Sequence, residues 1–172
     1  MKWFSFFILG YLALGFQVAL AGHIDVRGAE PNFVLLVVVF LAINGSREPA
    51  LLGSFLLGLM QDLLTLHPMG TWAVAYALVA TFVLSTQEVV YREHPLTHFS
   101  LALLGGILCA VVLTFHGWVY PMLHGRGGNY GSPVGLVKSA LYTAVIAPLI
   151  LGVLQRIKAA FGFRRGRGSK AG

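Results

Sequence analysis

Long apolar runs separated by short clusters of charged residues constrain the fold of this chain most strongly. Of its 172 residues, 57% are hydrophobic and only 10% are charged. A run of about 20 apolar residues crosses roughly 30 Å of hydrocarbon as a helix, and in lipid a helix satisfies its own backbone hydrogen bonds. The pattern therefore predicts an all-α, polytopic membrane bundle.

Six apolar runs are expected to form the helices of this bundle. They lie at about residues 3–21, 32–43, 49–66, 71–85, 97–120 and 134–154. Residues 1–157 are expected to form one six-helix membrane domain, and residues 158–172 a basic tail. Pro95 is expected to stop any helix, and the Gly-rich residues 121–133 are expected to form a loop.

The first run has two interpretations. It ends in Ala19-Leu20-Ala21 before Gly22, which imitates a signal-peptidase site. Its apolar part is somewhat longer than a normal signal core. The segment is therefore either a retained membrane helix or a cleaved signal, and both interpretations leave the downstream topology unchanged.

The basic residues predict the orientation in the membrane. With six spans and both termini inside, nine basic residues fall on the inner side: Lys2, Arg47, Arg92, Arg156, Lys158, Arg164, Arg165, Arg167 and Lys170. The outer loops hold only Arg27 and Arg126. This asymmetry follows the positive-inside rule and predicts two cytoplasmic termini. The net charge of +6 does not indicate nucleic-acid binding, because no aromatic-studded basic groove accompanies the tail.

A stripe of small residues on the third run organises the expected packing. At four-residue spacing, Ala50, Ser54, Gly58 and Asp62 share one helical face. Small residues let a neighbouring helix approach closely, and a carboxylate at membrane depth needs a partner or water. We expect this stripe to be a helix-packing or partner face that points at protein rather than at lipid.

Five polar residues are expected at a similar membrane depth. They are Gln17, Gln61, Asp62, Tyr76 and Lys138. Opposite charge and shared depth suggest the hypothesis that Asp62 faces Lys138 within this polar layer. In the alternative, Lys138 extends to the outer headgroups, and Asp62 is a helix-end acid that pairs with solvent or a loop amide.

The sequence contains no pattern that indicates catalysis or a cofactor. Cys109 is the single cysteine, and the six histidines lack metal-ligand spacing. Asp62 is the only acid expected at depth, so two-carboxylate chemistry lacks its second member. We expect no catalytic, cofactor or metal site.

Residues 31–70 resemble the MreD family of rod shape-determining membrane proteins. The resemblance rests on Pro31 before an apolar run, Gly53, the Gly-Leu-x-x-Asp motif of residues 58–62, and Pro68-Met69-Gly70. The similarity is looser up to about residue 155. The family often has an acid at the position of Asn32, so no role is carried to that residue.

The resemblance implies a non-enzymatic scaffold of the bacterial elongation machinery in the cytoplasmic membrane. Family members associate with an MreC-like single-span protein, the RodA/penicillin-binding-protein synthase and MreB. The resemblance also implies a fold similar to the six-helix substrate-binding subunits of energy-coupling-factor transporters. The alternative function is a vitamin-type binding subunit, which predicts a roomy outward pocket lined by Trp72, Tyr76 and Trp118. A membrane enzyme would need a second catalytic group beside Asp62.

Overall fold

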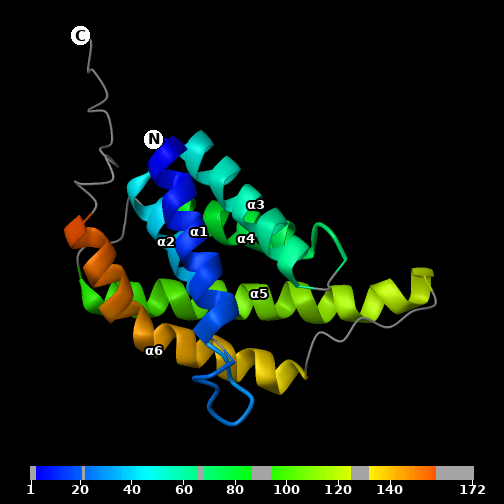
Figure 1. Cartoon of the computed structure of the whole chain (residues 1–172). Coiled ribbons are helices and arrows are strands. Elements are labelled where there is room, and N and C mark those ends of the chain that lie inside the picture. Colours follow the sequence, from blue (N-terminus) through cyan, green and yellow to red (C-terminus); the bar gives the residue numbers. More distant parts are fainter. Residues whose placement is uncertain (1–2, 21, 66–67, 87–93, 125–131, 158–172) are drawn as a thin grey trace.

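The computed structural model describes residues 3–20, 22–65, 68–86, 94–124 and 132–157. Within them the chain forms six α-helices (Figure 1): α1 (Trp3–Leu20), α2 (Phe33–Asn44), α3 (Arg47–Leu64), α4 (Thr71–Thr86), α5 (Pro95–His124) and α6 (Pro133–Ile157). An isolated β-bridge joins Val26 and Ala29 in the α1–α2 linker. The expected all-α class is confirmed.

The short helix α2 forms the centre of the bundle. It contacts each of the other five helices, and every residue from Val34 to Asn44 is buried. A helix of 12 residues is about 18 Å long, which is shorter than the roughly 30 Å of a bilayer core. Because protein surrounds α2, this helix is apolar on all its faces.

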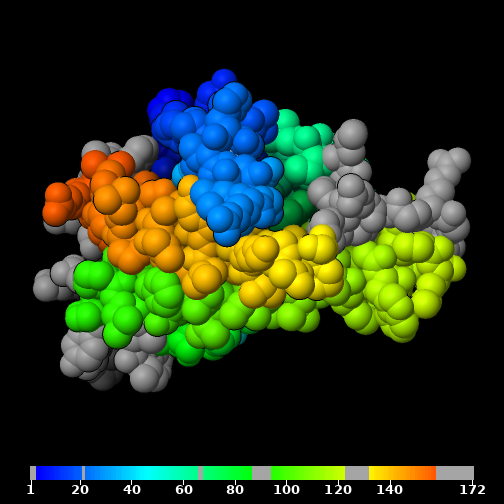
Figure 2. Space-filling model, turned by 90° about the horizontal axis from the view of Figure 1, so that it is seen from below, coloured from blue at the N-terminus to red at the C-terminus, as the bar shows by residue number. Residues whose placement is uncertain are grey.

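The helices α5 and α6 form a long hairpin across the other elements (Figure 1). Figure 2 shows α6 lying along α5, while the far end of α5 reaches beyond α6. The two helices approach closely at Gly106, where an added Cβ would lie 2.7 Å from the Cβ of Ala140. Side-chain size at this point therefore sets the spacing of the hairpin.

Two expected bounds differ at α5. The helix begins at Pro95, two residues before the expected start at residue 97, and it continues through Pro121 to His124, so the expectation of a loop from residue 121 is wrong. Proline suits the first helical position because its missing N–H would have no partner there, and the Leu96 N–H is capped by His94 Nδ1 at 3.3 Å. Near the other end, Pro121 removes only one helical hydrogen bond. Residues 125–131, which belong to the expected loop, lie outside the described residues. The expected basic tail of residues 158–172 also lies outside them.

The apolar helices make this chain a membrane protein. In the described residues, α1, α6 and the Pro95–Met122 part of α5 are long and apolar enough to cross a membrane. The helices α2 and α4 are apolar but shorter, and α3 carries Arg47, Glu48 and Asp62. In Figure 1 the beginning of α1 and the end of α6 lie toward the same end of the molecule.

Candidate functional site

The small-residue stripe of α3 lies inside the bundle. Ala50 and Ser54 are fully buried, Asp62 is 3% exposed, and Gly58 is also buried. A Cβ added to Gly58 would overlap the backbone of Trp72 and Ala73 at the beginning of α4. The glycine therefore allows α4 to contact α3 at the level of the main chain.

Asp62 binds the beginning of the same helix. Its Oδ2 accepts from the backbone N–H of Gly70 at 2.9 Å and of Ala73 at 3.3 Å, and its Oδ1 accepts from Trp72 N–H at 2.9 Å. Gly70 has φ +99°, a conformation that glycine adopts without strain. The first N–H groups of a helix have no intrahelical partner and favour negative charge. Asp62 and Gly58 together hold the α3–α4 turn closed.

The expected pair of Asp62 and Lys138 is not made. Both carboxylate oxygens of Asp62 bind α4, whereas Lys138 is exposed on α6. The N-terminus of α4 carries the partial positive charge of the helix dipole, which stabilises the Asp62 carboxylate. The buried charge therefore does not require the ammonium group of Lys138. The loop-amide alternative describes Asp62 correctly, and Lys138 does not belong to the buried polar cluster.

A second set of polar contacts surrounds the beginning of α2. The Oδ1 of Asn32 accepts from Leu35 N–H at 2.8 Å and so caps the helix. The Tyr76 hydroxyl lies 3.0 Å from Asn32 Oδ1 and 2.6 Å from Gln61 Oε1, with its proton shared between the two oxygens. On the other side, Gln17 accepts from Phe33 N–H at 2.8 Å and donates to Pro31 O at 3.1 Å. Gln17, Gln61 and Tyr76 therefore converge on the α2 N-terminus.

The helix α6 holds the linker that leads into α2. Thr143 Oγ1 accepts from Asn32 N–H at 2.9 Å, and Ser139 Oγ accepts from Glu30 N–H at 3.0 Å. Farther along, the Tyr142 hydroxyl donates to Ile24 O at 3.2 Å. These contacts fasten residues that are more than 100 positions apart in sequence.

Sequence reasoning missed Asn32, Ser139 and Thr143 as members of this cluster. Two signals could have found them. Asn32 stands directly before an apolar run, which is typical of a helix cap. Ser139 and Thr143 are four residues apart on an apolar helix, so both hydroxyls project from one face.

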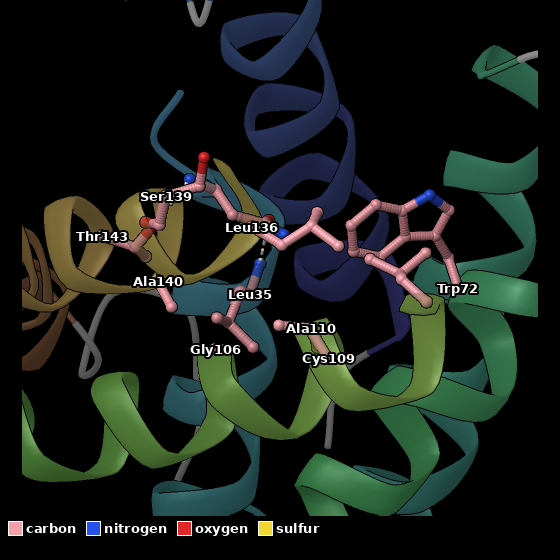
Figure 3. A pocket seen from close by; sticks show the side chains of 11 residues that line it. Leu35, Trp72, Gly106, Cys109, Ala110, Leu136, Ser139, Ala140 and Thr143 are labelled. Atoms are coloured by element: carbon pink, nitrogen blue, oxygen red, sulfur yellow. Dashed lines mark hydrogen bonds between the residues drawn. The ribbon is translucent and has the colours of Figure 1, made fainter. Parts of the chain in front are cut away.

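A small cavity adjoins the cluster (Figure 3). Its volume is about 40 Å³, and its walls include Asn32, Trp72, Gly106 and Ser139. Ligand sites usually have volumes of roughly 300–1,000 Å³. Tyr76 does not line this cavity. Trp118, which is exposed on α5, lines a separate open groove of about 450 Å³ between α5 and α6. The vitamin-binding alternative expects Trp72, Tyr76 and Trp118 around one pocket, whereas the described residues place Trp72 and Trp118 at different hollows.

The described residues offer no metal centre. No group of three His, Cys, Asp or Glu side chains among them is placed to hold an ion. The buried polar groups instead cap helices and join them. Chemically, the hydrogen bonds of this cluster can position helices.

Comparison with known proteins identifies the family. The family model of the rod shape-determining protein MreD matches residues 1–126. The match includes α1 to α5 with Gly58, Asp62 and the Asn32 cap, and α6 lies beyond it. No curated protein and no solved structure matches the chain. Since the family model covers most of its length, this membrane protein belongs to the MreD family of rod shape-determining proteins.

Proposed function

We propose that this protein is a non-enzymatic membrane scaffold of the bacterial cell-elongation complex. In this role it contacts an MreC-like single-span protein, the RodA/penicillin-binding-protein synthase and MreB, and thereby regulates peptidoglycan synthesis and cell shape. The observation that carries the proposal is the MreD match over residues 1–126. The buried polar groups, which cap and join helices, support a structural role.

The outer surface offers room for partners within the membrane. An apolar groove of about 430 Å³ lies between α1 and α3, with Tyr11, Gly15 and Leu63 among its lining residues. No atom lies within 4 Å of a Cβ added to Gly15. Unlike the buried stripe of α3, this surface remains accessible to lipid or to another helix.

The proposed topology has six spans and two cytoplasmic termini in the inner membrane, with a fold similar to energy-coupling-factor substrate-binding subunits. The beginning of α1 and the end of α6 lie toward the same end of the molecule in Figure 1, which supports an even number of membrane crossings. Nine basic residues on the inner side against two on the outer side support cytoplasmic termini. Single cysteines at Ser46 and Ser132, both exposed, test it in a Cys109→Ala background. Labelling of position 132 and not of position 46 by a membrane-impermeant maleimide in intact cells agrees with the topology, and the reverse pattern contradicts it.

Crosslinking in cells tests the scaffold function. A photoreactive amino acid at Gly15 or Leu63 is activated, and the full-length protein is purified with its adducts. Recovery of an MreC-like protein or of the synthase supports the proposal, with the same residue at buried Ala75 as the control. Retention of a vitamin by the purified protein, without either partner, would instead favour a binding subunit.

A further inference from the structure

The cavity beside the α2 N-terminus has an unusual hydrogen-bonding character. Its walls are mostly apolar and come from α4, α5, α6 and the beginning of α2. Among the described residues that line it, Asn32, Ser139 and Thr143 carry amide or hydroxyl groups. Thr143 is fully buried, whereas Asn32 and Ser139 are partly buried. The hydrogen bonds of these three side chains indicate what the cavity can hold.

The helix cap fixes the orientation of the Asn32 side chain. Its Oδ1 accepts from Leu35 N–H and faces the Tyr76 hydroxyl. A flipped amide would place an N–H₂ group against the Leu35 N–H donor, so the observed orientation is the stable one. Its Nδ2 thus carries two donors, and neither has an acceptor among the described residues.

The hydroxyl groups of Thr143 and Ser139 on α6 differ in whether their protons already have an acceptor. Thr143 donates to Ser139 O at 2.7 Å and accepts from Asn32 N–H, so its proton is used. Ser139 accepts from Glu30 N–H, and its own proton has no acceptor in the described part of the chain. The polar wall of the cavity therefore presents donors that need an oxygen acceptor.

The size of the cavity selects the acceptor. A volume of about 40 Å³ accommodates about two water molecules, given that each needs at least 10–15 Å³. A monatomic anion would fit, but among the described residues no Lys, Arg or His lines the cavity to balance its charge, and an unpaired buried charge is costly.

We propose that this cavity is a hydration site, in which water accepts from Asn32 Nδ2 and Ser139 Oγ and links the α1–α2 linker to α6. The inference is independent of the scaffold function, because it concerns only how the beginning of α2 is hydrogen-bonded. The water supplies the acceptors that the helices do not, and so completes the buried polar cluster.

Hydroxyl-radical footprinting of the full-length protein in lipid nanodiscs tests the site. Radicals formed from internal water oxidise the adjoining side chains. Leu35 and Leu113 line the cavity and are 1% and 3% exposed. Leu41 and Leu151 are equally buried at 0% but do not line it. We expect Leu35 and Leu113 to be oxidised several-fold faster than Leu41 and Leu151, and equal rates would overturn the proposal.

Two variants and a salt exchange sharpen the test. Ala110→Leu fills the cavity and should slow oxidation of Leu35 and Leu113, whereas Val111→Leu on the exposed face should not.

Asn32→Asp distinguishes water from a bound anion. The variant keeps the cap and lets water donate to the carboxylate, so fast oxidation of Leu35 and Leu113 should persist. A bound anion would be expelled by that carboxylate, and oxidation that depends on chloride or is lost in Asn32→Asp contradicts the proposal. If Ala110→Leu does not fold, the comparison of Leu35 and Leu113 with Leu41 and Leu151 in the wild-type protein still tests the proposal.

Discussion

The two hairpins α3–α4 and α5–α6 both pack through glycine, but in different ways. Gly58 of α3 lies against the backbone of α4, and Asp62 fastens the same turn through three N–H groups. A Cβ added to Gly106 of α5 would instead meet the side-chain Cβ of Ala140 on α6 first, at 2.7 Å, and the backbone Cα of Ala140 less tightly, at 3.0 Å. A side chain can be changed to restore space and a backbone cannot. The α3–α4 contact should therefore be much less tolerant of substitution than the α5–α6 contact.

Gly58→Ala should have the largest effect. The new Cβ would overlap the backbone of α4, and no rotamer change relieves the clash. We expect destabilisation of about 3 kcal/mol or more, at the upper end for overpacking, together with loss of cell-shape rescue in a strain that lacks the gene. Thermal unfolding of the purified protein measures the change. Gly152→Ala, where nothing lies within 4 Å of the new Cβ, is the control, and an unfolding temperature of Gly58→Ala equal to that of the control would contradict this contact.

Gly106→Ala should cost less, and its effect should be reversible. The new Cβ would lie 2.7 Å from that of Ala140, so we expect roughly 1–2 kcal/mol of destabilisation. Adding Ala140→Gly removes the opposing methyl group and should restore part of the lost stability, because the Ala140 Cα remains 3.0 Å from the new Cβ. Failure of this double variant to recover would mean that the clash is not between these two side chains.

Asp62→Asn should have a moderate effect. The amide keeps one acceptor for α4 but loses the charge and the second acceptor, so we expect a loss of about 1 kcal/mol. Lys138→Met should be nearly neutral, and the effects of the two substitutions should add. A coupling free energy between them in a double-mutant cycle would restore the ion-pair hypothesis.

The contrast between the hairpins also shows what the sequence can reveal. The spacing of Gly58 and Asp62 predicts a buried face because both lie on one helix, where periodicity is local. The partner of Asp62 also lies nearby in sequence, yet opposite charge suggested the distant Lys138. Charge alone is a poor guide here because backbone N–H groups, which every sequence contains, satisfy the carboxylate.

The cluster around Asn32 was harder to predict. Helix length predicts a shared depth for Gln17, Gln61 and Tyr76, but depth does not give the angular position of a helix in the bundle. Thr143 and Ser139 are more than 100 residues from their partners, and only the packed helices bring them together. Long-range contacts of this kind are missing from any local pattern in a single sequence.

Thr143→Val should have the smallest effect of the series. It removes the acceptor for Asn32 N–H in a buried position and keeps the side-chain shape. Hydrogen bonds between membrane helices average about 0.6 kcal/mol, so we expect a loss of roughly 0.5–1 kcal/mol. Thr114→Val on the exposed face of α5 is the matched control. Because α6 is held to the linker by several weak bonds rather than by one close backbone contact, the variant should loosen residues 22–32 in hydrogen exchange while leaving the α3–α4 turn protected. Equal loss of protection in both regions would show that the two parts of the molecule are not independent.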